Sequence, residues 1–411
     1  MGCKGIIAKI CSPDHILFFI YAALFLLPLH SWLFYIPILS AALLSILRML
    51  AGRRMDWKTG PLKWPAAGFL ICSFLSVWGS ADPLFSLFNW CFLPLMYALL
   101  YILIQTYVSE DKEKKTALYI FLAGAACVAA WGFFQYADVG GMAHDLHSHG
   151  WVDPDRFPLL RRRMFSTLEN PNLFGAYLLM IISMLAPFLL EERNRNRKIV
   201  FGLFLLVLLV CLALTYSRGA WLSLAAIILG LALFYDKRFG WVFLLIPLIL
   251  FLYHGQITER FFSLFSGEDT SVSLRFALWE STIAMIEEHP ALGIGWGSYW
   301  LTYPAYNFFI QDPGVIIFHA HDMYLHIPAE VGLPGGFFYF LLFFGQGVLF
   351  WRAWNKETGI SRLLGLGGVL LVMSAAVDGI GDYALFSRSV SFCFWALASL
   401  SISGRQKVLD K

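Results

Sequence analysis

The chain has 411 residues, of which 59% are hydrophobic and 14% are charged, and its mean hydropathy is +0.68. No class of soluble globular protein has this composition, so we expect an all-α polytopic integral membrane protein that forms a single membrane domain over residues 1–411. The net charge of +3 says little by itself, because in a membrane protein the placement of Lys and Arg carries the information.

Apolar runs of roughly 20 residues, the length that crosses a bilayer as a helix, recur along the chain. The first follows Lys4 and Lys9 without a clear small-residue cleavage site, so we interpret it as an uncleaved span. The sequence predicts about twelve transmembrane helices, centred near residues 21, 41, 72, 99, 126, 181, 207, 227, 246, 342, 370 and 395.

The basic residues divide between the two sides of the expected membrane. If the N-terminus lies inside, the inside loops and both termini hold every lysine of the chain. The outside then carries only arginines, namely Arg156, Arg161, Arg162, Arg163, Arg218, Arg260, Arg275 and Arg388. Arginine grips phosphate oxygens through two parallel N–H donors, so these residues are candidates for binding a phosphate group. Salt bridges to local acids are the alternative, which we prefer for Arg156 and Arg260.

Two of the outside loops are large, one over about residues 137–169 and one over about 254–330. Between Ser271 and His289 the second loop has apolar residues at helical spacing, namely Val272, Phe276, Trp279, Ile283 and Ile286. This pattern predicts an amphipathic helix that lies on the membrane or over a cavity.

Three outside arginines lie in segments that favour anion binding. Arg163 precedes a turn at residues 170–172 that can cap the next helix, and a helix N-terminus attracts anions. Arg218 interrupts the apolar sequence 199–234, and a charge at that depth is a functional candidate. Arg275 lies on the predicted amphipathic helix, where it could face a lipid phosphate or a substrate phosphate. The alternatives are a helix start with a basic flank for Arg163 and an interfacial turn for Arg218.

The stretch from Phe318 to Gly336, FHAHDMYLHIPAEVGLPGG, groups histidines and acids between apolar runs. Each of these polar groups needs a partner once it is removed from water. A neutral imidazole suits general-base chemistry near pH 7, which makes His321 and His319 candidates for accepting a proton from a hydroxyl nucleophile. A histidine that only satisfies its own hydrogen bonds is the alternative.

A metal site is the other interpretation of the histidine clusters. His319 and His321 stand beside Asp322, and His144, His147 and His149 form the segment HDLHSH. Zinc sites usually draw ligands from two separated pairs, often with cysteine. We therefore predict no metal at either cluster and interpret HDLHSH as a solvated loop.

Four segments together resemble the O-antigen ligase and O-antigen polymerase family of bacterial envelope proteins. The order of these segments over residues 160–336 also agrees with that family. So do the prediction of about twelve helices and that of one large outside loop late in the chain. The segment after His321 matches the ligase pattern except that Asp322 replaces the usual Asn, Ser or Gln. The matching residues are Arg163 with Asn170, Pro171 and Asn172; Tyr216, Ser217, Arg218 and Gly219; Arg275 with His289, Pro290, Gly293 and Gly295; and His321 with Gly332 and Gly335.

The resemblance implies transfer of a glycan from an undecaprenyl-diphosphate carrier to an acceptor hydroxyl, without a cofactor, at the periplasmic face of the bacterial inner membrane. His321, with His319 as second candidate, would be the base. Arg218, Arg275 and Arg163 would bind the diphosphate.

Other residues are weaker candidates within the same resemblance. Asn172, Asp322 and Arg388 are further candidates for substrate binding, and Asp378 and Asp382 lie near the outer ends of the last two spans. Asp322 could also favour the charged form of a neighbouring imidazole.

The family leaves the acceptor open. It is a lipid A core for a ligase, a growing glycan for a polymerase, or a protein. Membrane lipids are the expected surroundings, and nucleic acid is not an expected partner. A transporter or flippase for an anionic lipid is the main alternative from another class, and a non-catalytic membrane scaffold is a third.

Overall fold

The computed structural model describes residues 10–53, 56–137, 163–168, 170–244, 270–307 and 316–402. Regular secondary structure in these ranges is helical, without a strand, as the composition predicted. The longer helices are α2 (Pro13–Leu26), α3 (Tyr35–Leu50), α4 (Lys63–Leu75), α5 (Pro83–Phe92), α6 (Pro94–Tyr107), α7 (Asp111–Tyr136), α9 (Pro171–Glu191), α10 (Arg195–Leu214), α11 (Arg218–Phe234), α14 (Thr270–Glu288), α16 (Met323–Lys356), α17 (Gly359–Gly381) and α18 (Arg388–Ile402).

Six helical segments of the described chain are long and apolar enough to cross a bilayer: Pro83–Tyr107, which joins α5 and α6, together with α7, α9, α10, α16 and α17. The helices α2, α3, α11 and α18 are apolar but shorter. Every predicted span centre except the one near residue 246 falls within a described helix. The all-helical architecture is thus confirmed in the described residues, and six apolar segments of this length are consistent with a multi-pass membrane protein. Twelve crossings remain a prediction.

Several predictions concern residues outside the described ranges. These are the span near residue 246, most of the loop 137–169, residues 254–269 and 308–315 of the second loop, and the three histidines of HDLHSH.

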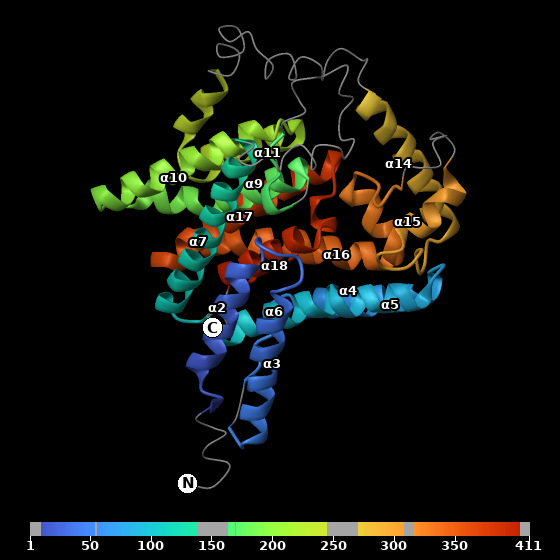
Figure 1. Ribbon diagram of the computed structural model, residues 1–411, viewed down its shortest axis with the longest axis horizontal. Coiled ribbons are helices and arrows are strands. Elements are labelled where there is room, and N and C mark those ends of the chain that lie inside the picture. Colours follow the sequence, from blue (N-terminus) through green and yellow to red (C-terminus); the bar gives the residue numbers. More distant parts are fainter. Residues whose placement is uncertain are drawn as a thin grey trace.

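The centre of the protein is built from α9, α16, α17 and α18, and α11 packs on α9 and α17. In α9 almost every residue from Pro171 to Pro187 is buried, and α18 is buried over most of its length. By contrast, α10 exposes large side chains such as Leu203 and Leu206, as expected of a helix that faces lipid. Figure 1 shows α4 running alongside α16, with α14 and α15 (Tyr299–Thr302) together at one end of it.

The predicted amphipathic helix is present as α14, but the face that packs on the protein is not the predicted apolar stripe. The buried residues are Leu278, Ser281, Thr282 and Met285, whereas Phe276 and Ile283 are exposed. The Thr282 hydroxyl forms a hydrogen bond of 2.8 Å with the Tyr299 hydroxyl. Because this polar group has a partner, a partly polar face of α14 can pack on the protein. Phe276 and Ile283 belong to the stripe that we expected to lie on the membrane or over a cavity.

The loop after α14 docks against a break in α16. At Gly332 the backbone has a φ of +72°, so the helix is kinked there. The amides of Ile294 and Gly295 donate to the carbonyls of Ala329 and Glu330, and the Leu333 amide donates to the carbonyl of Pro290. The kink therefore supplies the polar backbone groups that hold the loop.

Glycine is required where the two backbones touch. A Cβ at Gly332 would lie 2.3 Å from the Ala291 carbonyl oxygen, and one at Gly293, which has a φ of +71°, would lie 2.5 Å from the Glu330 carbonyl. No side chain fits either position, and positive φ adds strain to any other residue.

We expect Gly332→Ala to destabilise the protein by at least about 2 kcal/mol. The strain of a positive φ at alanine and the overlap of its Cβ with the Ala291 carbonyl both contribute. Gly52→Ala is the matched control, since Gly52 also has a positive φ of +81° but no atom within 4 Å of a Cβ. Thermal unfolding of the purified variants measures both. Equal midpoints for the two variants would contradict the close contact at the kink.

Candidate active site

The candidate site lies where the N-termini of α9, α11 and α16 meet the C-terminus of α17. Their N-caps are Asn170, Ser217 and Asp322, and each accepts a hydrogen bond from a backbone amide of its own helix. A Cβ on Gly175 would already lie 2.9 Å from Ala220, so glycine there lets α9 and α11 approach closely. Helix N-termini carry partial positive charge, so this junction favours anions.

Positive φ at non-glycine residues marks the same segments. Among the described residues it occurs at Ser166, Tyr216 and His321, with φ values of 56°, 51° and 51°. Each lies in a segment that the sequence singled out. Left-handed backbone is unfavourable for such residues, and strain of this kind is concentrated at functional sites.

A chain of hydrogen bonds links His321 to Arg163 through two other side chains. His321 Nδ1 lies 3.2 Å from Asp382 Oδ1, and Asn172 Nδ2 donates to Asp382 Oδ2 at 3.0 Å. Arg163 Nη2 donates to Asn172 Oδ1 at 2.8 Å, and its Nε donates to the carbonyl of Thr215 at 2.7 Å. Asn172 and Arg163 thus hold the acid that orients His321.

Asp382 is held as a carboxylate. Its Oδ1 also accepts from the amide of Tyr383 at 2.8 Å, so three donors surround the group. Burial by itself raises the pKa of Asp382, but the hydrogen bond from His321 and the charges of His321, His319 and Arg275 outweigh it, and the pKa lies below its usual range. An ionised acceptor at Nδ1 places the neutral ring's proton there and makes His321 Nε2 the proton acceptor.

His319 has the opposite arrangement. Its Nδ1 accepts from the backbone amide of His321 at 3.2 Å, which puts the proton of the neutral ring on Nε2. Burial and the neighbouring His321 lower the pKa of His319 well below its usual range. Of the two histidines, His321 is therefore the one whose surroundings suit a base.

The lowered pKa of His319 makes stability depend on pH. Below about pH 6.5 the unfolded chain binds a proton at His319, whereas the folded protein resists protonation there. The free energy of unfolding is therefore higher above this pH and falls as the pH is lowered through it. We expect His319→Gln to flatten the fall in thermal midpoint between about pH 7.5 and about pH 5. His15→Gln, at an exposed site, serves as the control and should keep the wild-type slope. An unchanged slope in His319→Gln would contradict the assignment.

The other predicted arginines occupy different surroundings. Arg218 is the first residue of α11 and is buried, and Gly219 beside it lies close to the Asp378 carboxylate. Arg275 on α14 is close enough for its charge to lower the pKa of Asp382. Arg388 instead stacks its guanidinium on Trp32, 3.7 Å from the ring centroid.

Asp322, the sequence neighbour of His321, points elsewhere. Its side chain caps α16 by accepting from the amide of Leu325 at 2.8 Å. Burial raises the pKa of Asp322. The carboxylate that pairs with His321 is Asp382, which the sequence indicated only as a residue near the end of a span.

His326 and Glu330, one turn apart on α16, form a buried pair behind the site. His326 Nε2 lies 3.4 Å from Glu330 Oε1, and the same oxygen accepts from the amide of Tyr299 at 3.3 Å. His326 Nδ1 accepts from the amide of Ala320, next to His319. These contacts tie α15 and the histidine segment to α16.

Among the described residues, His319, His321 and Asp382 could together hold a metal ion. One ligand atom from each lies within 4.8 Å of the others. Both Nδ1 atoms already take part in hydrogen bonds, to Asp382 and to the amide of His321. A metal-independent reaction remains our prediction and is tested below.

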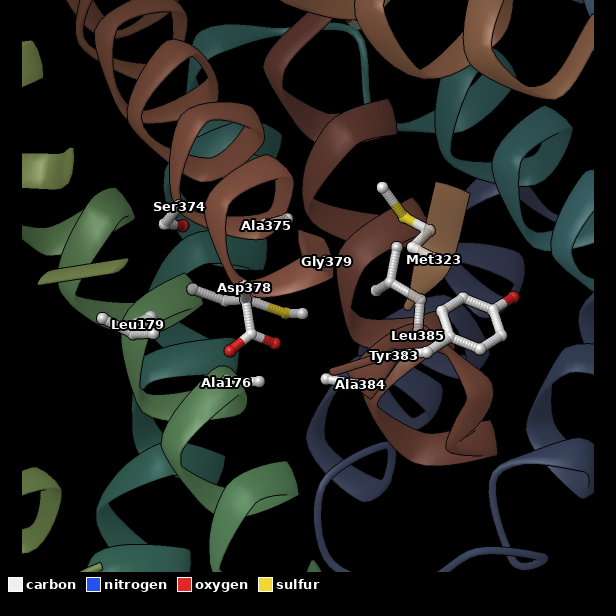
Figure 2. A pocket seen from close by; sticks show the side chains of 11 residues that line it. Ala176, Leu179, Met323, Ser374, Ala375, Asp378, Gly379, Tyr383, Ala384 and Leu385 are labelled. Atoms are coloured by element: carbon white, nitrogen blue, oxygen red, sulfur yellow. The ribbon is translucent and has the colours of Figure 1, made fainter. Parts of the chain in front are cut away.

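A small cavity of about 10 Å³ lies beside this junction, which is room for about one water molecule. Figure 2 shows the Asp378 carboxylate pointing into the space between Ala176 of α9 and Ala384. Met323, the first residue of α16, lines another side. Asp378 thus faces a gap where α9, α16 and α17 meet.

Residues 201–340 match the family model described as O-antigen ligase. This segment is therefore similar to an O-antigen ligase domain. The match includes Arg218, Arg275, His319 and His321, which the resemblance named.

The chain is also similar to the "ComP-specific O-oligosaccharyltransferase" of Acinetobacter baylyi, with 29% identity over 147 residues. The alignment covers 33% of this chain and 26% of that protein, so the chain spans about a quarter of the length of the relative it matches.

Residues outside the ligase-domain match complete the site. Arg163, Asn172 and Asp382 lie before or after residues 201–340, and packing alone brings them to His321. Helix-start signals indicated the first two, whereas the role of Asp382 as partner of His321 had no local sequence signal.

Proposed function

We propose that the protein is a membrane glycosyltransferase that moves a glycan from an undecaprenyl-diphosphate carrier to an acceptor hydroxyl. The reaction takes place at the periplasmic face of the bacterial inner membrane, with both chain termini in the cytoplasm. The pairing of His321 with Asp382 at a junction of helix N-termini carries the proposal, because it joins a base to an anion-binding environment. The similarity of residues 201–340 to the O-antigen ligase model supports the same class of reaction.

In this proposal His321 is the general base. Asp382 holds the Nδ1 proton, so Nε2 takes the proton of the acceptor hydroxyl as its oxygen attacks the anomeric carbon. Asp382 also stabilises the imidazolium that forms. One displacement breaks the bond between the anomeric carbon and the carrier phosphate, so the configuration at that carbon inverts.

The diphosphate leaving group carries the negative charge that must be stabilised. Arg218 at the start of α11 and Arg275 on α14 supply permanent positive charge, and the helix N-termini add partial charges. Arg163 acts on the same region by fixing Asn172. Low local dielectric makes these interactions stronger than they would be in water.

The acceptor of a ligase would be a lipid A core, and that of a polymerase a growing glycan. A protein acceptor is a second candidate, favoured by one observation: the curated relative is named for oligosaccharyl transfer specific to ComP. Within the proposed class, all three acceptors share the attacking hydroxyl.

Reconstitution tests the proposal. The full chain in proteoliposomes is supplied with a defined undecaprenyl-diphosphate oligosaccharide and, in parallel, with lipid A core, a glycan or an acceptor protein. We expect acceptor-dependent release of undecaprenyl diphosphate and a glycosylated product. Movement of the intact carrier across the bilayer without its cleavage would instead support a flippase and overturn the transferase.

Chelation tests the metal-independent form of the reaction. We expect the rate of carrier release to stay unchanged, within about twofold, in excess EDTA, because arginines and helix N-termini supply the positive charge. A loss of activity that added divalent cations restore would assign His319, His321 and Asp382 to a metal site instead.

A further inference from the structure

A larger cavity lies between α4, α6, α16 and α18, away from the histidines. Its volume is about 340 Å³, within the range of small-molecule pockets. The lining is mainly apolar and aromatic, with Phe69, Tyr97, Leu342 and Trp395 among its residues. A cavity of this size and lining suits a hydrocarbon chain.

One polar side chain in the lining has no partner in the described part of the protein. Gln346 is fully buried, and neither Nε2 nor Oε1 of its amide makes a hydrogen bond there. By comparison, the side-chain amide of Gln105, which is also buried, does have a partner: it donates to the carbonyl of Ser399 at 2.7 Å. Burying an unsatisfied amide is unfavourable, so a ligand with polar atoms at this position would be stabilised.

The polar end of the cavity coincides with a positive charge. Gly345, next to Gln346, packs against Leu62, since a Cβ there would lie 3.2 Å from Leu62 Cδ2. Gln346 therefore lies at the level of Lys63, the exposed first residue of α4 and part of the cavity lining. Lys63 Nζ lies 5.5 Å from the ring centroid of the exposed Trp64. Lysine and tryptophan together are typical of a lipid headgroup region.

The other end of the cavity is apolar and extends along α6. The lining includes Pro94 and Ile102, which are separated by roughly 12 Å of helix. The cavity thus has a cationic mouth, one amide just inside it and an elongated apolar interior.

We propose that this cavity binds one acyl chain of an anionic glycerophospholipid. The phosphate pairs with Lys63, an ester carbonyl accepts a hydrogen bond from Gln346 Nε2, and the chain lies along α6. Binding here is independent of the proposed transfer reaction, because none of these residues belongs to the candidate active site.

The experiment uses the full chain in a neutral detergent with phosphatidylglycerol or phosphatidylcholine. Native mass spectrometry counts bound lipid, and lipid titration of the thermal midpoint measures affinity. We expect wild type to bind one phosphatidylglycerol in preference to phosphatidylcholine. Gln346→Leu should weaken phosphatidylglycerol binding by roughly fivefold to tenfold, as the loss of one hydrogen bond predicts. Lys63→Ala should abolish the preference, whereas Lys112→Ala, at an exposed lysine on α7, should leave it unchanged.

Two further measurements separate lipid binding from folding. In lipid-free detergent Gln346→Leu should melt no lower than wild type, because it removes an unsatisfied amide. Ala98→Phe, which fills the cavity from α6, should block lipid binding. Equal affinity of wild type for the two lipids, or undiminished phosphatidylglycerol binding by Gln346→Leu or Ala98→Phe, would overturn the proposal.

Discussion

His321→Ala should lower the rate constant of glycan transfer by about 10² to 10⁴, because the acceptor hydroxyl loses the group that takes its proton. The side chain is about one-third exposed and pairs with Asp382, so its removal leaves no large apolar cavity. Donor binding, which we propose to depend on the arginines, should be retained. The measurement is carrier release in single turnover, with donor affinity determined separately.

Two controls keep this prediction specific. His15→Gln, at an exposed site in the first turn of α2, should retain full activity. The thermal midpoint of His321→Ala should stay near that of wild type, which separates loss of the base from loss of the fold. A folded His321→Ala protein with full transfer activity would rule out the proposed base.

Asp382→Asn should reduce transfer by a similar factor, about 10² to 10⁴, through the tautomer of His321. An amide NH₂ turned toward Nδ1 would favour the ring with its proton on Nε2, which cannot then accept a proton. The carboxylate that stabilises the imidazolium is also lost. Donor affinity should change little, since the substituted group orients His321.

The readout for Asp382→Asn is the rate constant of carrier release together with its pH profile. Activity should be low over the whole pH range, and Asp382→Glu should recover part of it, because a carboxylate returns at Nδ1. Asp56→Asn, at an exposed loop position, is the matched control. Wild-type rates in Asp382→Asn would show that His321 acts without this partner.

The helices could be predicted from hydrophobicity because both lipid and the protein interior exclude unsatisfied backbone, which forces long apolar runs into helices. The face of α14 could not be predicted in the same way. Its packed side includes Ser281 and Thr282, and Thr282 is accommodated through the hydroxyl of Tyr299. Periodicity of apolar residues therefore located the helix but not its buried side.

For the candidate site, sequence motifs indicated the residues but not their roles. Arg163 was expected to bind the diphosphate, which stays a prediction, and its hydrogen bonds to Asn172 and Thr215 show that it also supports Asp382. Arg388 was a possible substrate ligand, and it stacks on Trp32. A guanidinium has several donors, and which acceptors it reaches depends on which helices pack together.

By itself the sequence determined that the chain is helical with long apolar segments and a histidine segment before a glycine-marked helix, and it predicted that the arginines gather on one side of a membrane. Hydrophobic length, charge placement and local turn chemistry suffice for that. Only the tertiary structure decided that His321 pairs with Asp382, 61 residues away, and that Asn172, 210 residues from Asp382, holds the same carboxylate. Asp322 is adjacent to His321 in the chain, but as the N-cap it directs its side chain to the amide of Leu325, and helix packing supplies the partner instead.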